Sequence, residues 1–427
     1  MSDPTGLNAQ DVQTLRTLGE WAAGAAASPA NQEKIRAWYR HDEGAPERRV
    51  MVLAEMSYLT GDKQRQPVEA RELQCTDPWA RQLEAQFRMR RFETEVVRDD
   101  HVVSPFVEYA PVVHSTGFGL PAGEHREAGA DPLAFNYQPP LRTLDEADFA
   151  RLRHRTFRWD REAEARTQDR LEAIFEGILP VRRRCGPWQL GVPVTSTVLS
   201  FVGLDNFMML MYDNPAGLHR LMAFVRDDQL AFLDWADAEG MWPLNHEGDY
   251  VGAGSMGFTR KLPATDFTGK VRCADRWGLS ESQESAGIGP AQYREFVHPY
   301  LKAIAARFGR VYYGCCEAVD PILDCLAEVK NLARLSVSPW ANEELVGPFC
   351  RQRGIAYSRK PRPTLFMPPV YDEGAVRDHL AKTVDCARGC SLEIIQRDVY
   401  TTHDQPQRFG RWVELVRAAA LAFRPLG

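Results

Sequence analysis

The feature that most constrains the fold is a regular alternation of predicted strands and helices in the C-terminal part of the chain. Four apolar segments with strand character lie at residues 310–316, 332–339, 355–361 and 391–401, and a segment with helical spacing follows each of them. A less regular version of the same order extends back to about residue 140. Parallel strands joined by helical crossovers are the simplest structure with this order. The pattern therefore predicts an α/β fold.

The number of these units favours a closed barrel. About eight units fit between residues 105 and 427, so we expect a (β/α)8 TIM barrel over 105–427. Residues 1–104 are expected to form a mostly helical N-terminal extension with one strand candidate, "RRVMVLAEM". An open, doubly wound sheet is the alternative, but no glycine-rich dinucleotide fingerprint follows the first strand.

Charge and composition narrow the class of protein. The net charge of −6, without a long run of Lys or Arg, argues against a nucleic-acid partner. No apolar run approaches the roughly 20 residues that a membrane span needs. The polar start of the sequence does not resemble a signal peptide, and nine cysteines without an export signal indicate a reducing compartment. We therefore expect a cytoplasmic protein with a small-molecule substrate.

Polar residues that directly follow the predicted strands are the candidate site residues, because barrel enzymes carry their chemistry at the C-terminal ends of strands. This filter selects Cys315, Cys316 and Glu317 after the strand "RVYYG". Glu281 and Glu284 are interpreted as loop carboxylates near the mouth of the barrel. The other candidates that follow predicted strands are His114, Thr195, His246, Glu247, Trp340, Arg359, Lys360, Asp398 and His403.

The adjacent cysteines have several interpretations. Zinc accepts thiolate, imidazole and carboxylate ligands, so Cys316, Glu317 and His246 are a candidate metal site. The alternative is that one cysteine packs against the following helix and the other caps the strand. The spacing is not a C-x-x-C motif, and therefore the sequence alone does not decide between these readings.

The order of segments resembles the uroporphyrinogen decarboxylase superfamily. The resemblance rests on "GVPVTSTVLSFVGLDNFMMLMYDNPAGLHRLMAFV" and on "GIGPAQYREFVHPYLKAIAARFG", and it covers roughly residues 105–427. It implies a TIM barrel with its cleft at the C-terminal ends of the strands. True decarboxylases of this family carry an "RQAGR"-type stretch that grips substrate carboxylates, and this chain has none. The chain is therefore more similar to the cobalamin-dependent methyltransferase branch.

That branch binds zinc through a His-x-Cys motif after one strand and a cysteine after the last strand. In this chain Gly314 and Cys316 stand at the first two positions, and Asp398 falls near the third. The resemblance implies a zinc-assisted methyltransferase that moves a methyl group between a small substrate and cobalamin. A partner protein would carry the cobalamin, since the chain lacks the "DxHxxG" cobalamin-binding signature.

The resemblance also suggests roles for the candidates. Asp398 or Glu247 would activate the methyl donor or acceptor, and His114 would orient or protonate the substrate. The expected substrate-binding residues are Thr195, Trp340, Arg359, Lys360 and His403. Two alternatives remain open. One is a cofactor-free decarboxylase or lyase, with Arg359, Lys360 and His114 holding a substrate carboxylate; the other is a non-catalytic barrel that binds a corrinoid or a partner.

Overall fold

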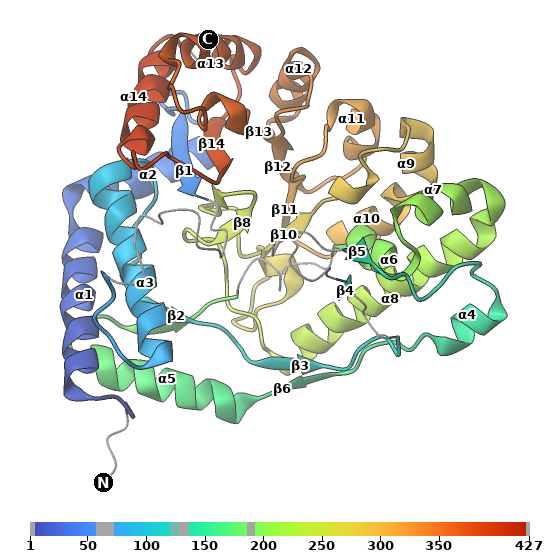
Figure 1. Cartoon of the computed structure of the whole chain (residues 1–427), viewed down its shortest axis with the longest axis horizontal. Helices are drawn as coiled ribbons and strands as arrows, with labels where there is room; N and C mark the ends of the chain where they lie inside the picture. Colours follow the sequence, from blue (N-terminus) through green and yellow to red (C-terminus); the bar gives the residue numbers. More distant parts are fainter. Residues whose placement is uncertain (1–4, 57–71, 121–123, 126–135, 186–192, 424–427) are drawn as a thin grey trace.

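The computed structural model describes residues 5–56, 72–120, 124–125, 136–185 and 193–423. Its centre is a six-stranded parallel sheet in the order β1-β14-β13-β12-β11-β10. The strands are β1 (Met51–Met56), β10 (Trp277–Ser280), β11 (Arg310–Tyr313), β12 (Leu332–Val337), β13 (Ala356–Arg359) and β14 (Leu392–Val399). Helices cover the outer face of this curved sheet (Figure 1). The predicted α/β class and the four predicted C-terminal strands are confirmed.

Every second residue of a strand points its side chain outward, and the outer helices pack on these side chains. Val52, Val311, Leu335 and Ile394 belong to the same large hydrophobic cluster as residues of these helices. The helices that follow the strands along the chain are α9 (Pro290–Phe296), α10 (His298–Ala305), α11 (Leu323–Leu326), α12 (Glu343–Arg353), α13 (Glu373–Cys386) and α14 (Arg408–Ala420). The other strand residues face the concave side, where the site is to be sought.

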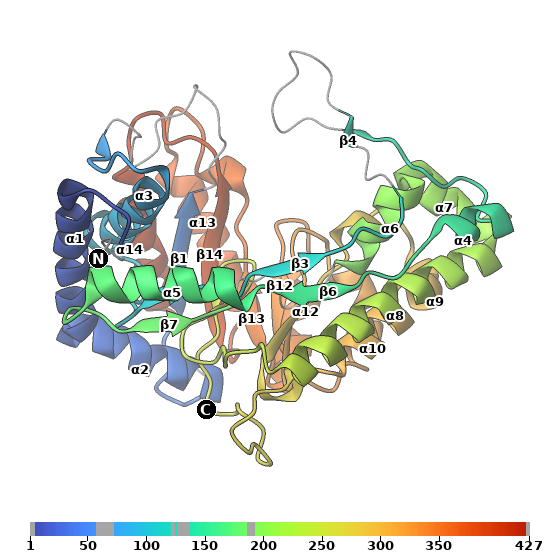
Figure 2. The same cartoon turned by 90° about the horizontal axis from the view of Figure 1, so that it is seen from below.

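The remaining elements flank the concave side in two groups (Figure 2). One group contains α1 (Ala9–Ala27), α2 (Pro29–Glu43), α3 (Pro78–Phe92), η2 (Glu93–Val97), α5 (Arg161–Phe175) and the parallel pair β2 (Val107–Tyr109) and β7 (Val181–Arg183). The other contains α4 (Glu146–Arg151), α6 (Val194–Val202), α7 (Leu204–Asp213) and α8 (Pro215–Glu239). Short antiparallel pairs complete the chain: β3 (Val113–Ser115) with β6 (Phe157–Trp159), β4 (Glu124–His125) with β5 (Asn136–Tyr137), and β8 (Tyr250–Gly252) with β9 (Ser255–Met256).

The structure bears on three expectations about the fold. The described residues form an open six-stranded parallel sheet, and a closed eight-stranded barrel is not shown by them. Strand β1 lies within residues 1–104 and pairs with β14, so the sheet itself crosses the predicted domain boundary. The segment "WQLGVPVTSTVLSFVG" is expected as a strand running into a loop, but its described part forms helix α6. Its buried Val194, Val198 and Val202 recur every four residues, which is helical spacing that its β-branched composition conceals.

Within the described ranges, no single helix is both long enough and apolar enough to cross a bilayer. Helices α6 and α7 meet these two criteria only when they are taken together, and the chain bends by 89° between them.

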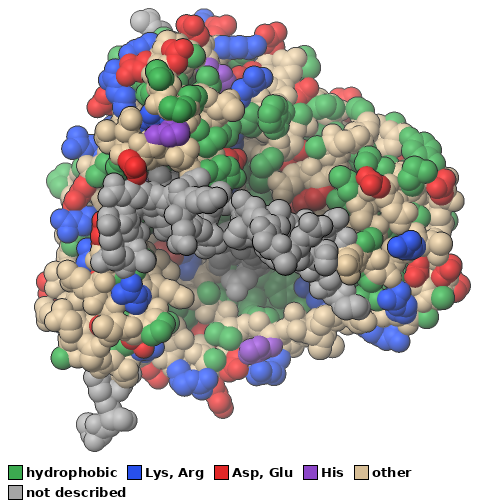
Figure 3. Space-filling view, in the orientation of Figure 1, with side chains coloured by type: hydrophobic (Ala, Val, Ile, Leu, Met, Phe, Trp, Pro, Cys, Tyr) green, Lys and Arg blue, Asp and Glu red, His purple; other side chains and the backbone are tan. Residues whose placement is uncertain are grey.

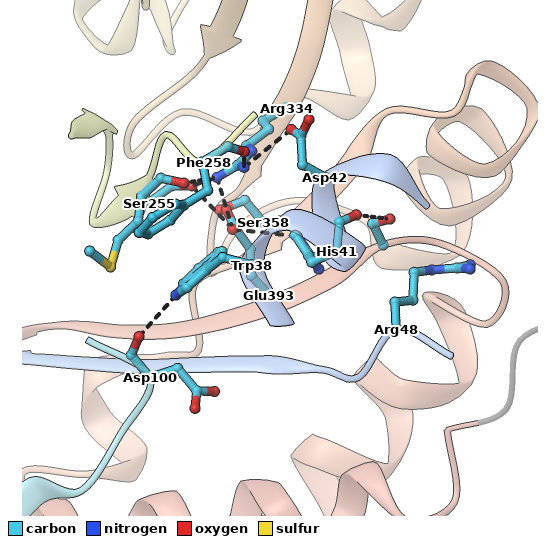
Figure 4. Close-up of polar contacts among 12 residues, drawn as sticks. Trp38, His41, Asp42, Arg48, Asp100, Ser255, Phe258, Arg334, Ser358 and Glu393 are labelled. Atoms are coloured by element: carbon cyan, nitrogen blue, oxygen red, sulfur yellow. Dashed lines mark hydrogen bonds and ion pairs between the residues drawn. The ribbon is translucent and has the colours of Figure 1, made fainter. Parts of the chain in front are cut away.

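A buried ionic layer occupies the concave side near the N-terminal ends of the strands (Figure 4). Arg334 lies between Asp42 at 3.3 Å and Glu393 at 3.5 Å, and its Nη1 donates to Ser255 Oγ at 2.6 Å. His41 Nε2 lies 3.7 Å from Glu393 Oε2. Burial and the charge of Arg334 lower the pKa of His41 to about 3, so its ring is neutral at physiological pH. Asp42 and His41 come from the end of α2, and this layer therefore fixes the N-terminal helices to the sheet.

Candidate functional site

The opposite edge of the sheet carries a second polar group, which we call the strand-end cluster. Because all six strands run in parallel, their C-terminal ends meet at one edge. The cluster consists of Glu55 on β1, Tyr250 on β8, Glu281 after β10, Cys315 after β11, Lys360 after β13 and Arg397 on β14. Figure 3 shows that one face of the molecule is hollowed near its centre, with hydrophobic side chains in the visible part of the hollow.

The side of the cluster nearest β14 is cationic. Arg397 Nε donates to Glu55 Oε2 at 2.8 Å, and the described part of the chain offers no acceptor to its two Nη groups. Burial alone would lower the pKa of Arg397, but Glu55 together with the other acidic groups around it outweighs burial, and the net shift is upward. Arg397 therefore presents a charged planar fork, which matches the geometry of a carboxylate.

Lys360 is the buried cation of the cluster. Its Nζ donates to Ser358 O at 3.1 Å and also to Tyr312 Oη and Ser358 Oγ. Burial lowers the pKa of Lys360 to about 7, with Glu393 opposing the shift and Arg397 adding to it. Its charge can therefore change near neutral pH.

The side of the cluster nearest β10 is acidic. Burial raises the pKa of Glu281 to about 8, and the nearby carboxylates of Glu284 and Glu317 add to the shift. Glu281 Oε2 accepts the Gln283 N–H at 2.9 Å, and no cation among the described residues pairs with it. Thr195 Oγ1 donates to Glu284 Oε2 at 2.7 Å. Glu281 is thus mostly protonated at neutral pH and is able to donate a proton.

The two adjacent thiols lie between these halves. Cys315 Sγ and Cys316 Sγ are 3.6 Å apart. The contact raises the pKa of Cys315 and lowers that of Cys316, which makes the exposed Cys316 the more acidic thiol. Glu317 Oε2 accepts the Cys315 N–H at 2.8 Å, and its Oε1 accepts the Ser282 N–H at 3.1 Å. Both oxygens of Glu317 are therefore used to hold the loop, and burial raises its pKa.

The predicted zinc ligands do not converge. Among the described residues, no three His, Cys, Asp or Glu side chains form a group that could hold a metal ion. Glu317 binds backbone N–H groups, and His246 lies in the loop before β8, so Cys316 has neither as a co-ligand. Gly314 has φ of 99°, and a Cβ there would lie 3.0 Å from Ser336 Cβ. The backbone therefore disfavours a histidine at the position where the resembled family has one, and we derive no step through zinc.

Several predicted residues lie away from the cluster. His114 is exposed on β3, where its Nε2 lies 3.2 Å from Asp160. Glu247 is exposed and forms an ion pair with Arg182 at 2.7 Å. Arg359 points to the helix side of β13 and binds Glu343 at 2.9 Å, because neighbouring strand residues face opposite sides.

The other predicted substrate contacts are distributed unevenly. Lys360 lies in the cluster, and Asp398 interacts with the charge of Cys316 and so lies near it. Thr195 is buried, and its hydroxyl donates to Glu284, which lies in the loop after β10. Trp340 is exposed, and His403 Nε2 contacts Met367 O at 2.9 Å. The roles of these residues stay predictions.

Sequence reasoning missed a cavity beside β1 and the residues that build it. The cavity has a volume of about 430 Å³ and includes Glu55 and Tyr250, so it adjoins the strand-end cluster. His101 also lines it, and the buried Asp99 lies behind His101. The sequence signal was an Asp-x-His pattern in "VRDDHVV", which does not follow a predicted strand.

Solved structures that are similar to this chain were found by comparison with known proteins. No protein-family model matches the chain, and no curated protein matches its sequence. A solved structure described as a methyltransferase from Methanosarcina mazei is similar to it, with 13% sequence identity and a TM-score of 0.49. The match covers 91% of this chain and 98% of that one. At this level of similarity the likeness establishes no activity.

Proposed function

We propose that the chain is a methyltransferase that moves a methyl group between a small substrate and a corrinoid carried by a partner protein. The observation that carries the proposal is the position and protonation of Glu281. A carboxyl group with a pKa of about 8 at the strand-end edge is suited to protonate a leaving heteroatom at neutral pH. The sequence resemblance to the cobalamin-dependent methyltransferase branch supports the choice of reaction.

In the demethylation direction, the bond between the methyl carbon and the substrate heteroatom breaks, and the bonding electron pair stays on the heteroatom. Glu281 gives its proton to that atom and becomes a carboxylate. Arg397 holds and orients a polar group of the substrate from the opposite side of the cluster. A reduced corrinoid would supply the electron pair that accepts the methyl group.

Methylated substrates with different leaving groups test this proposal. Demethylation of an aryl methyl ether releases a phenolate, which a proton from an acid stabilises, whereas demethylation of a quaternary methylammonium compound releases a neutral amine, which needs no proton. With at least one of these substrate classes, we expect methyl transfer to reduced cobalamin. The visible absorption spectrum of the cobalamin measures this transfer. If ethers react, Glu281→Gln should slow them by about 100-fold and leave quaternary ammonium substrates nearly unchanged.

The exposed Glu295 provides a matched control, since Glu295→Gln removes a carboxylate outside the cluster. Equal rates of ether demethylation in wild type and Glu281→Gln would contradict the role of Glu281. Absence of transfer from methylated amines, ethers and thioethers would contradict the proposed reaction.

A second candidate is a cofactor-free decarboxylase or lyase acting on a small carboxylated metabolite, and it is favoured by the Nη groups of Arg397, which have no acceptor among the described residues. In that reaction Arg397 would bind the substrate carboxylate, and Glu281 would protonate the carbon that carbon dioxide leaves. Release of labelled carbon dioxide without added corrinoid, lost in Arg397→Gln, would support this candidate over methyl transfer.

A further inference from the structure

The cavity beside β1 has walls from parts of the chain that are distant in sequence. Its lining comes from α3 and η2, from the segment around β2, from the end of β7 and from the β8–β9 hairpin. The charged and aromatic lining residues include Arg90, Glu93, His101, Glu108, Arg184 and Tyr250. Its volume of about 430 Å³ lies in the range of small-molecule sites.

A carboxylate–imidazole pair forms part of the wall. Asp99 is fully buried, and its Oδ2 lies 2.7 Å from His101 Nδ1. The same oxygen accepts the Ala54 N–H at 2.9 Å, which ties the pair to β1. Asp99 Oδ1 accepts the His101 N–H at 2.9 Å. Three hydrogen bonds thus fix both the carboxylate and the ring.

The surroundings keep His101 cationic. Burial alone would lower the pKa of His101, but the carboxylates of Asp99 and Glu93 outweigh burial and the opposing charge of Arg90 and raise it to about 9. With Nδ1 bound to Asp99, the ring has its Nε2–H as a second donor. No described residue accepts from Nε2.

The other cations of the cavity wall already have carboxylate partners. Arg90 lies 2.9 Å from Glu93. Arg184 Nε donates to Asp249 at 2.6 Å, and its Nη1 pairs with Glu108. Each arginine of this wall thus has a carboxylate partner, whereas the Nε2–H of His101 has no acceptor among the described residues. A charged donor in a partly enclosed cavity forms its strongest hydrogen bond with an anionic acceptor.

From this geometry we propose that the cavity binds a small organic molecule through an anionic oxygen, and that His101, held by Asp99, donates Nε2–H to that oxygen. Carboxylates and phenolates share this chemistry, and Tyr109 and Tyr250 on the wall provide aromatic surface for the rest of the molecule. The inference concerns binding and does not depend on methyl transfer.

Benzoate and benzamide test the inference, because they have the same shape and differ in charge. We expect benzoate to bind the full-length protein at least tenfold more tightly than benzamide in calorimetric titrations at pH 7. His101→Gln should remove this preference and leave benzamide binding unchanged. 4-Nitrophenol tests the phenolate source, since binding of its anion increases the visible absorption of the phenolate form.

His154 is a matched control, because it also faces a buried carboxylate, Asp228 at 3.7 Å, but does not line the cavity. His154→Gln should keep the tenfold preference. A readout without substitution uses wild-type protein labelled with nitrogen-15 in its ten histidines. In NMR spectra, benzoate should shift the nitrogen-15 signals of one doubly protonated histidine ring, and benzamide should not. Equal binding of the two compounds, or unchanged histidine signals at saturating benzoate, would overturn the inference.

Discussion

Replacement of Glu281 by Gln should change how the stability of the protein depends on pH. The pKa of Glu281 is raised from 4.5 to about 8 in the folded chain, mainly by burial. Between these two values the folded state holds a proton that the unfolded state releases. The group therefore contributes full stability below pH 4.5, and this contribution is lost as pH rises through 8. Gln cannot ionise, and the variant should not show this loss.

The size of the effect follows from the shift. At 1.36 kcal/mol per pKa unit, the change from 4.5 to about 8 corresponds to about 5 kcal/mol at most. Because the Glu281 side chain is partly accessible to water, screening reduces this, and we expect about 2–3 kcal/mol. The wild type should lose that much more unfolding free energy than Glu281→Gln between pH 5 and pH 9.

Urea unfolding at pH 5, 7 and 9 measures this difference. Lys360 and His101 also titrate between pH 5 and pH 9, but they do so in both proteins, so the comparison isolates Glu281. Glu295→Gln, which removes an exposed carboxylate, should follow the wild type at every pH. Parallel pH profiles for wild type and Glu281→Gln would refute both the raised pKa and the assignment of Glu281 as an acid.

Three further outcomes are expected. Iodoacetamide should modify Cys316 before Cys315 in mass spectra of digested protein, since Cys316 is exposed and is the more acidic thiol; faster labelling of Cys315 would contradict this. Gly309→Ala should lower the unfolding free energy by about 1–3 kcal/mol, because its Cβ would lie 2.3 Å from Ala274 O. Gly24→Ala, in open space within α1, should instead raise it by about 0.5–1 kcal/mol. Arg334→Met should cost about 3–5 kcal/mol in urea unfolding, because it leaves the buried Glu393 carboxylate without its arginine partner, whereas Asp42 keeps Arg310 at 2.9 Å; a loss below about 1 kcal/mol would contradict the role of the ionic layer.

The strands of the C-terminal half were predictable because they are buried on both faces. Strands of this kind appear as short continuous apolar runs, and β11, β12, β13 and β14 all lie within the predicted segments. Lys360 and Cys315 follow β13 and β11, at the sheet edge where the rule for polar residues after strands expects candidate residues. These features depend on local sequence and on the direction of the strands, and both can be read from one chain.

The choice between neighbouring residues was not predictable. Arg359 and Lys360 are adjacent, yet Arg359 binds Glu343 on the helix side and Lys360 points to the concave side. Only the phase of the strand relative to the sheet decides which of them faces the site, and a run such as "AYSRK" does not reveal it. The same limit applies to Glu281, which resembles an ordinary loop carboxylate until the folded chain buries it.

The two polar layers of the concave side differ in a way that assigns the functional edge. In the layer at the N-terminal ends, the side chains of Arg334, Asp42 and Glu393 are at most 1% exposed, so no ligand can reach them. Arg334 pairs with both carboxylates, and Arg310 gives Asp42 a second cation. At the C-terminal ends, the described residues provide neither a cation beside Glu281 nor an acceptor for the Nη groups of Arg397. An unpaired acid and an unsaturated cation cost folding free energy, and such groups are expected where a substrate completes their interactions. The strand-end cluster, together with the adjoining cavity, is therefore the place where substitutions should change binding and catalysis more than folding.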